Sequence, residues 1–391
     1  MTMSEMHEQV IAGFRTEFRR EPQVVTRAPG RLEILGNHTD YNEGVVLSVA
    51  VDRATYVAAA ACPGKDCRIK DLRDGSEREF RTDQLSHPRP RDWANYVKGL
   101  VVELQRRKVQ VPGFQAVLLS SVPLSAGMSS SAALEISMCY ALSRLANTVL
   151  PWQEWAKIGQ ASENNYVGAK TGLLDQFSSI RGRKGHLVFS DFRSLEVTNV
   201  PLPPGTALVV ANSMVKHHLT NEYNERRQCC EQAVAFLQTK FAGVRALRDV
   251  TRAQLEACAP EMDPLAFRRA LHVVGENERV FAGIKALEAN DLTTFGQLMF
   301  ESQASSRENF ENSAPELDIL VEEGRRLPGL IGARLSGGGF GGITVHLVES
   351  SRAEQYSHDL AAAYRQRTRL DAQVMTCSAA DGAEILLGAK R

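Results

Sequence analysis

The sequence offers two carboxylates twelve residues apart, Glu163 and Asp175, on either side of Gly172. Glu163 falls late in a helix expected over residues 152–167. One carboxylate of such a pair can help to hold Mg²⁺, and the other can orient or deprotonate an attacking hydroxyl. The spacing alone leaves another interpretation open, because most single carboxylates are simply solvated.

A loop of small residues, PLSAGMSSSAALE, covers residues 123–135 and runs into an expected helix. Small side chains let phosphate oxygens approach backbone N–H groups, which the positive end of the helix dipole reinforces. Serine hydroxyls can also bind a metal ion. A serine N-cap is the alternative, but three consecutive serines exceed what capping requires and favour phosphate binding. The residues concerned are Gly127, Ser129, Ser130 and Ser131.

A polar loop follows a short strand expected at residues 32–35. It offers donors, acceptors and charges at the end of a strand, where hydroxyl-rich ligands are commonly bound. An ordinary turn rich in Asn and Asp is an equally good interpretation. The loop contains Asn37, His38, Thr39, Asp40, Tyr41 and Asn42.

A glycine-rich run, LSGGGFGG, covers residues 335–342 and formally contains GxGxxG. A dinucleotide-binding interpretation fails because the run leads into the β-like segment ITVHLV and not into a helix. Five glycines in six positions still indicate a loop that approaches something closely or takes positive φ. A tight hairpin is the alternative.

The composition limits the class of protein. The chain has 391 residues, enough for two domains. Its 46 basic and 46 acidic residues argue against a nucleic-acid binder. Seven scattered cysteines without a CxxC pair indicate a reducing compartment. With neither an export signal nor a membrane span, we predict a cytoplasmic protein whose partners are small molecules, with no nucleic acid, membrane or protein partner.

The elements that position these residues are interspersed helices and strands without regular βαβ alternation, which favours an α+β fold. Strands are expected at residues 24–26 and 32–35, separated by a turn at Pro29-Gly30, and again at residues 45–51 and 55–61. We place a domain boundary near residue 200, giving domains 1–200 and 201–391. The cleft between them is the default ligand site.

Taken together, the motifs resemble those of the GHMP small-molecule kinases, a superfamily named after galactokinase, homoserine, mevalonate and phosphomevalonate kinases. Within it the chain looks most like the galactokinases. GRLEILGNHTDYNEG is similar to their sugar-binding signature, PLSAGMSSSAALE to their phosphate loop, GLLDQF to the stretch with the catalytic aspartate, and GARLSGGGFGG to the third motif. The resemblance spans about residues 24 to 348.

The resemblance implies an N-terminal domain of ribosomal-protein-S5-like topology and a C-terminal ferredoxin-like domain, with ATP and sugar meeting between them. It also implies transfer of the terminal phosphoryl group of ATP to the anomeric hydroxyl of galactose, with Mg²⁺ as cofactor. Asp175 corresponds to the base or orienting carboxylate, and Arg31 to the residue that steadies the alkoxide and the transferring phosphoryl group.

The other residues follow from the same resemblance. Mg²⁺ is expected to be bound by Ser129, Ser130 and Glu163. ATP is expected to be bound by Gly127, Ser129, Ser130, Ser131, Gly337, Gly338, Gly339 and, towards the adenine, Trp93. The sugar is expected to be bound by Glu33, Asn37, His38, Asp40, Gly172 and Tyr223.

The chain departs from the family signature, GRxNxIGEHTDYN, at two places. Asn37 stands where the family has the glutamate that contacts the C6 hydroxyl, and Glu33 replaces an asparagine. Arg31 and Glu33 have the same parity on a strand and are expected to point to one face. Our hypothesis is that Glu33 partly compensates for the lost glutamate.

Changed specificity is the rival hypothesis, with arabinose, galacturonate or N-acetylgalactosamine as the sugar. A non-catalytic sugar- and ATP-responsive regulator is a further alternative. The serine run, Arg31, Glu163 and Asp175 are all present, which disfavours the regulator.

Overall fold

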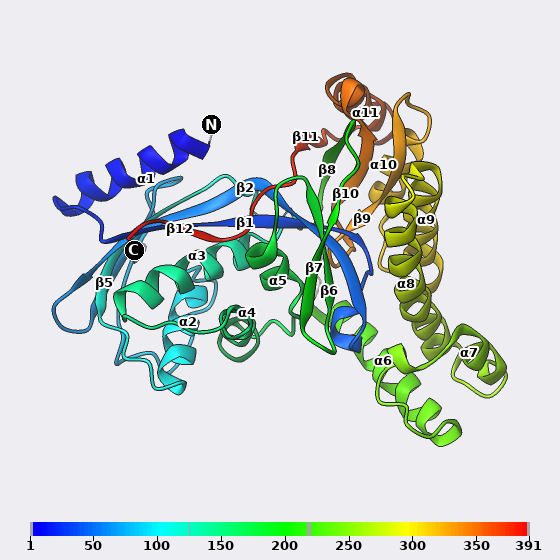
Figure 1. Cartoon of the computed structure of the whole chain (residues 1–391), viewed down its shortest axis with the longest axis horizontal. Coiled ribbons are helices and arrows are strands. Elements are labelled where there is room, and N and C mark those ends of the chain that lie inside the picture. The colour runs from blue at the N-terminus through cyan, green and yellow to red at the C-terminus, as the bar shows by residue number, and fades with distance from the viewer. Residues whose placement is uncertain (1–2, 125, 217–219, 389–391) are drawn as a thin grey trace.

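Two sheets organise the chain in the computed structural model, which describes residues 3–124, 126–216 and 220–388 (Figure 1). The strands of the first sheet run in the order β12-β1-β2-β5-β3-β4, and β6 and β7 extend it from β2. Only β3 and β5 pair in parallel among the described strands. The strands are β1 (Val24–Leu35), β2 (Val45–Cys62), β3 (Asp66–Asp71), β4 (Glu77–Arg81), β5 (Gly113–Ser120), β6 (His186–Asp191), β7 (Glu196–Pro201) and β12 (Glu384–Leu387).

The second sheet is antiparallel, with the order β11-β8-β10-β9. Its strands are β8 (Thr206–Lys216), β9 (Leu330–Ser336), β10 (Gly341–Glu349) and β11 (Gln373–Cys377). The helices are α1 (Met3–Phe18), α2 (Asn95–Arg106), α3 (Ser130–Leu145), α4 (Trp152–Ala161), α5 (Leu174–Arg181), α6 (Thr220–Lys240), α7 (Arg252–Cys258), α8 (Pro264–Glu288), α9 (Leu292–Ser305), α10 (Pro315–Gly324) and α11 (Ala353–Thr368). Short helical turns are η1 (Asp40–Asn42), η2 (Ser162–Val167), η3 (Leu247–Asp249), η4 (Ser306–Phe310) and η5 (Ser350–Arg352). This mixture confirms the α+β prediction.

Strand β1 passes straight through Pro29 and Gly30, so the predicted turn there is wrong. Pro29 pairs with Ala54 of β2, whereas Arg31 pairs with Ala50, and β2 therefore bulges opposite Gly30. A Cβ on Gly30 would lie 2.6 Å from the carbonyl oxygen of Met128, which accepts a hydrogen bond from the Arg31 N–H at 3.2 Å. The glycine allows the serine-rich loop to lie directly on β1.

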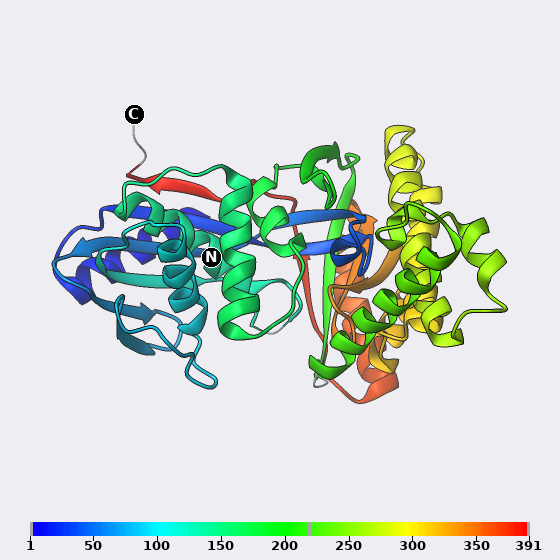
Figure 2. The same cartoon turned by 90° about the horizontal axis from the view of Figure 1, so that it is seen from below.

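Helices cover both faces of the first sheet. In Figure 1, α1 lies on one side of the strands and α2 to α5 lie on the other. Successive side chains of β2 point to opposite faces of the sheet and so pack against both helix layers. Tyr56 and Ala58 pack in the cluster with α1, whereas Val57 and Ala59 pack in the cluster with α2, α3 and α4. Figure 2 shows the α2–α5 layer from below.

One apolar core joins the two halves of the chain. It takes Leu47 from β2, Val210 and Val345 from the second sheet, Val280 from α8 and Phe295 from α9, all fully buried. The β1–β2 ribbon thus lies partly in each half. A shared core of this kind fixes the two sheets relative to each other.

The end of the chain returns to the first sheet. Strand β12 pairs with β1, and Ala379 forms a bridge with Val51 of β2. The boundary near residue 200 stays a prediction about domains, but the last strand does not lie with the rest of 201–391. Among the described residues, no helix combines the length and apolar character needed to cross a membrane.

We predict that Leu47→Ala lowers the free energy of unfolding by about 2–5 kcal/mol, because it opens a cavity in the core that joins the two halves. Leu370→Ala makes the same chemical change at a side chain that is 40% exposed, and its effect is expected to stay under about 1 kcal/mol. Urea denaturation followed by circular dichroism measures both. Equal effects of the two substitutions would contradict the shared core.

Candidate active site

An ion pair joins Arg31 of β1 to Asp175 in the first turn of α5. The Arg31 Nε and Nη2 atoms lie 2.8 and 2.7 Å from Asp175 Oδ1. Nη1 donates to the carbonyl oxygen of Gly127 at 2.7 Å. The Arg31 side chain is 7% exposed and that of Asp175 is 21% exposed, so the carboxylate is the more accessible member. This arrangement offers an oriented carboxylate beside a fixed positive charge.

The ion pair lies in the wall of a cavity between the two halves of the chain. The lining residues come from β1, the loop after it, the start of α5 and the glycine-rich loop between β9 and β10. They are Arg31, Glu33, Asn37, His38, Asp40, Thr171, Gly172, Leu174, Asp175, Gly337 and Gly338. Arg31 and Glu33 line the same cavity, as their shared parity on the strand predicted.

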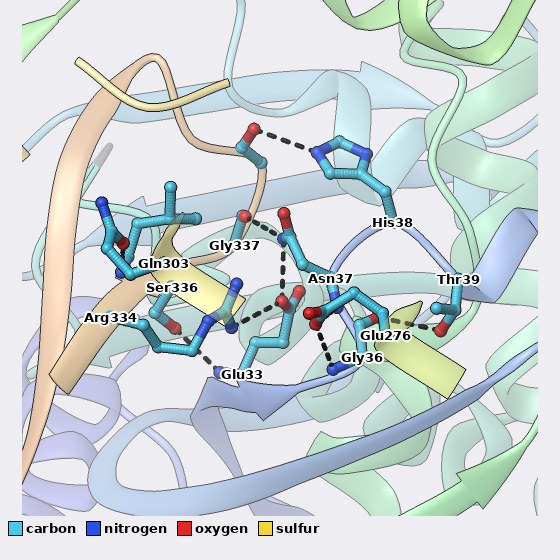
Figure 3. Close-up of polar contacts among 12 residues, drawn as sticks. Glu33, Gly36, Asn37, His38, Thr39, Glu276, Gln303, Arg334, Ser336 and Gly337 are labelled. Carbon is cyan, nitrogen blue, oxygen red and sulfur yellow. Dashed lines mark hydrogen bonds and ion pairs between the residues drawn. The ribbon is translucent and has the colours of Figure 1, made fainter. Parts of the chain in front are cut away.

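His38 is fixed between the two halves. Its Nε2 donates to the Gly338 carbonyl oxygen at 3.1 Å, and its Nδ1 accepts from the Tyr41 hydroxyl at 2.9 Å. Its ring lies 4.5 Å from the ring of Phe310. Burial lowers the pKa of His38 to about 4, so the ring is neutral near pH 7. Figure 3 shows it pointing at the glycine-rich loop.

Asp40 lies directly against Gly172. A Cβ on Gly172 would lie 1.7 Å from Asp40 Oδ2, so only glycine leaves room for this carboxylate. Burial and the nearby charges of Glu33 and Asp175 raise the pKa of Asp40 to about 7. The two residues predicted to hold sugar hydroxyls are therefore in contact.

A second cavity contains the residues predicted to lie near the nucleotide. Ser130 and Ser131, at the start of α3, share its wall with Trp93, whose Nε1 is buried without a hydrogen-bond partner in the described part of the chain. The full lining is Thr55, Asp71, Arg73, Trp93, Tyr96, Leu118, Ser120, Leu124, Ser130, Ser131 and Leu134. Asp71 and Arg73 carried no motif signal in the sequence.

Ser129 does not cap helix α3. It takes a left-handed conformation with φ 55° and makes no side-chain capping bond. Its Oγ is buried, and none of the described residues hydrogen-bonds it. An unpaired buried hydroxyl is costly unless a ligand satisfies it. The N-cap alternative is therefore wrong for Ser129, and the hydroxyl remains available to a ligand.

Glu163 lies in a buried carboxylate cluster. Thr171 Oγ1 donates to its Oε2 at 2.7 Å, and Gln176 Nε2 bridges it to Glu135 at 3.4 and 3.1 Å. Burial, helped by the charge of Asp175, raises the pKa of Glu163. The motifs alone gave no role to Gln176, which directly follows Asp175, or to Glu135, which ends the serine-rich segment.

The glycine-rich loop is a hairpin connection that faces the first cavity. Gly337 and Gly338 line that cavity, and Gly337 lies beside Gly127 and Arg31. Gly339 packs against the Asn312 backbone and lines neither cavity. Tyr223 belongs to α6, and its side chain lies outside the described residues.

Comparison with known proteins agrees with this geometry. The family model "Galactokinase galactose-binding signature" matches residues 12–61, and the models of the N-terminal and C-terminal domains of GHMP kinases match residues 95–183 and 284–366. A galactokinase of Roseiflexus sp. (strain RS-1) is 43% identical over 372 residues, covering 94% of each chain. One from Haemophilus influenzae is 39% identical and covers 95% of this chain and 97% of its own.

The chain belongs to the galactokinase family.

Solved structures lead to the same family. The Lactococcus lactis galactokinase complexed with galactose superposes with a TM-score of 0.91 at 29% identity, over 96% of this chain and 99% of the other. A mevalonate kinase from Methanococcus jannaschii shares the fold, with a TM-score of 0.62 at 16% identity over 91% of this chain and 98% of the other. This galactokinase-family protein is an ATP-dependent sugar kinase, as the motifs predicted.

We predict that Asp40 makes the stability of this galactokinase-family protein depend on pH. The native state holds the proton up to about pH 7, whereas an unfolded aspartate releases it near pH 4. The native state therefore binds more protons in that window, and its stability falls as the pH rises through it. Between pH 5 and pH 8 the wild type is expected to lose more unfolding free energy than Asp40→Asn.

Urea denaturation at several pH values provides the measurement. The exposed Asp371→Asn serves as the control and is expected to follow the wild type. Parallel profiles for the wild type and Asp40→Asn would contradict the raised pKa of Asp40.

Proposed function

We propose that this protein transfers the terminal phosphoryl group of ATP to the C1 hydroxyl of galactose, giving galactose 1-phosphate. The observation that carries the proposal is the Arg31–Asp175 pair in the wall of a cavity lined by polar groups of the galactose-binding signature. Membership of the galactokinase family supports the choice of sugar.

In the proposed reaction, Asp175 orients the C1 hydroxyl and accepts its proton as the oxygen attacks the terminal phosphorus. The bond between that phosphorus and the oxygen bridging to ADP breaks in line. Arg31 stabilises the negative charge on the attacking oxygen and the transferring group. Such a reaction depends mainly on positioning and on charge stabilisation. Arg31 is already held in place by the hydrogen bonds that it donates to Asp175 and to the Gly127 carbonyl oxygen.

The second cavity is the proposed site of ATP. Ser130 and Ser131 lie at the positive end of α3, where phosphate oxygens are stabilised. Trp93 brings an aromatic ring and an unpaired N–H to the same cavity, groups suited to an adenine ring. Gly127 and Gly337 lie beside Arg31, and Gly338 lines the first cavity.

Mg²⁺ is the proposed cofactor. Ser129 Oγ is buried without a partner among the described residues, and the hydroxyl of Ser131 hydrogen-bonds Glu163. Hydroxyl and carboxylate oxygens are ligands that Mg²⁺ accepts, usually together with phosphate oxygens of the substrate. Ser129, Ser130 and Glu163 therefore fit the ion, which would neutralise charge on the phosphates of ATP. In the described part of the chain no group of three or more His, Cys, Asp or Glu side chains could hold it alone.

The charges of the first cavity argue against galacturonate as the sugar. Glu33, Asp40 and Asp175 bring three carboxyl groups to its wall, and Arg31 is the only Lys or Arg among the lining residues. His38 is neutral. A sugar carboxylate would face the negative charges of Glu33 and Asp175 there, and also that of Asp40 above about pH 7. A hydroxymethyl group can instead donate a hydrogen bond.

We predict that galactose supports ATP consumption with a higher kcat/KM than arabinose, N-acetylgalactosamine or galacturonate, with galacturonate the poorest. Asp175→Asn is expected to lower kcat on galactose about 10²- to 10⁴-fold, because the carboxylate that accepts the proton is lost. An assay coupled to ADP formation over the sugar panel measures both effects.

The exposed Asp371→Asn is the matched control for loss of one carboxyl group and is expected to keep the wild-type rate. Absence of galactose-dependent ADP formation in the wild type would overturn the proposed function. Unchanged turnover in Asp175→Asn would remove this residue from the reaction.

We also predict that Glu163→Gln raises the Mg²⁺ concentration needed for half-maximal activity by about tenfold or more, since a charged oxygen ligand becomes neutral. Glu154→Gln, in the preceding helix α4, is the control and is expected to keep the wild-type Mg²⁺ dependence. Titration of activity with Mg²⁺ at saturating ATP and galactose measures the change. An unchanged titration in Glu163→Gln would exclude this residue as a ligand.

A further inference from the structure

Glu33 and Asn37 lie side by side in the wall of the first cavity (Figure 3). Both side chains are almost completely buried by protein atoms, although both border the cavity. Either could in principle hold a sugar hydroxyl. Their hydrogen bonds within the protein show which one has capacity left for a ligand.

The Asn37 amide is largely used by the protein itself. Its Nδ2 donates to Glu33 Oε1 and to the Gly337 carbonyl oxygen, both at 2.8 Å. Its Oδ1 accepts from Asn312 Nδ2 at 2.9 Å. An amide side chain has two N–H donors, so no donor remains for a ligand.

The Asn37 backbone is held as firmly. Its N–H donates to Glu276 Oε2 at 2.8 Å, and its carbonyl oxygen accepts from His272 Nε2 at 3.2 Å. Both partners belong to α8, in the other half of the chain. Asn37 is therefore a bridge between β1, α8 and the glycine-rich loop, and its orientation is fixed.

Glu33 keeps an open acceptor. Its Oε1 accepts from Asn37 Nδ2 and from Arg334 Nη1, which lies 3.0 Å away. No described residue hydrogen-bonds its Oε2. The Arg334 side chain is fully buried, and Glu33 is the only carboxylate that pairs with it in the described part of the chain. Burial raises the pKa of Glu33, whereas the charges of Arg334 and Arg31 oppose that rise. The ion pair with a buried guanidinium favours the ionised form of Glu33, and an ionised carboxylate is a pure acceptor.

The position of Glu33 on β1 indicates which part of the sugar it meets. Arg31 and Glu33 are two residues apart on one strand face, a separation of about 7 Å. Arg31 holds Asp175 at the transfer end of the cavity. A pyranose ring spans a comparable distance, so Glu33 faces hydroxyl groups on the side of the ring away from the transferring oxygen.

We propose that Glu33 is the specificity-determining residue of the sugar site, accepting a hydrogen bond from a hydroxyl remote from C1, and that Asn37 is the positioning residue that aligns it. This inference rests on the proposed function. It gives Glu33 the role of binding the hydroxyl and Asn37 the role of connecting the site to the second half of the chain.

The contact also constrains which pairs of residues are compatible. In Asn37→Glu a second carboxylate replaces the amide that now lies 2.8 Å from both Glu33 Oε1 and the Gly337 carbonyl oxygen. Both N–H donors of the amide would be lost, and the three acceptors would then meet with no donor between them. The exchange variant Glu33→Asn/Asn37→Glu restores one amide and one carboxylate.

The first experiment measures kcat/KM of purified wild type, Glu33→Gln and Glu33→Asp on galactose and on 2-, 3-, 4- and 6-deoxygalactose. The wild type is expected to lose about tenfold to a hundredfold on one of the 3-, 4- and 6-deoxy sugars, as for a lost hydrogen bond to a charged group. On galactose, kcat/KM of Glu33→Gln is expected to fall below that of the wild type by a similar factor, mainly through a higher KM. Replacing galactose with that deoxy sugar is expected to lower kcat/KM of Glu33→Gln little further.

Two controls accompany this experiment. The penalty for 2-deoxygalactose, beside the reacting carbon, is expected to be the same in wild type and Glu33→Gln. Glu8→Gln, an exposed change in α1, is expected to behave as the wild type. The inference would be overturned if Glu33→Gln showed the same penalty as the wild type for each of the four deoxy sugars. The proposed function is tested separately, by the galactose-dependent activity of the wild type.

The second experiment tests the positioning role and does not depend on Glu33→Gln being folded. Asn37→Glu is expected to raise KM for galactose at least about tenfold, and the exchange variant is expected to recover most of that loss. If the role of Asn37 were purely structural, the KM of the exchange variant for galactose would be raised at least as much as that of Asn37→Glu. Additive losses in Asn37→Glu, Glu33→Asn and the exchange variant would therefore overturn the inference.

Discussion

A buried ion pair between Glu33 of β1 and Arg334 of β9 holds the two sheets in register at the sugar cavity. Neither charge can be left alone, because an unpaired charge in a dry interior costs several kcal/mol. Breaking the pair would remove one tie between β1 and the strand that leads into the glycine-rich loop, beside the hydrogen bond from the Glu33 N–H to Ser336 Oγ at 2.8 Å. The bonds from Asn37 and His38 to Gly337 and Gly338 depend on that loop staying in place. The shape of the cavity therefore depends on this electrostatic requirement together with the shared apolar core.

Strand β1 meets this requirement while it also forms the hydrophobic core. Leu32 and Ile34 pack into the core shared by the two halves, whereas Arg31 and Glu33 face the cavity. The two-residue period of a strand makes this division possible. It also explains why every residue of β1 is buried although the strand carries three charged side chains. A slip of one residue would put the charges into the core and Leu32 and Ile34 into the cavity.

Most residues that line the first cavity lie in short motifs of the sequence, whose residue types suit sugar and phosphate. The contacts that hold these residues could not be predicted. Arg334 pairs with Glu33 of β1, and Glu276 and His272 bond to Asn37 just after β1, all from more than two hundred residues away. Pro29-Gly30 was taken for a turn because local composition cannot distinguish a turn from a bulge inside a strand. Gly30 leaves room for the carbonyl oxygen of Met128, a contact that only the tertiary structure reveals.

Arg31 lines the first cavity and contacts the serine-rich loop, whose residues Ser130 and Ser131 line the second cavity. This position constrains how the proposed reaction proceeds. One face of its guanidinium holds Asp175 in the sugar cavity, while Nη1 holds the Gly127 carbonyl oxygen in the loop that leads to α3. A sugar hydroxyl and a terminal phosphate can therefore approach the same positive charge from opposite sides. Because Arg31 is fixed by both contacts before any ligand binds, little reorganisation is needed as charge develops. The bulge at Gly30, the loop at Gly127 and the ion pair to Asp175 together fix Arg31 between the carboxylate of the first cavity and the serine-rich loop.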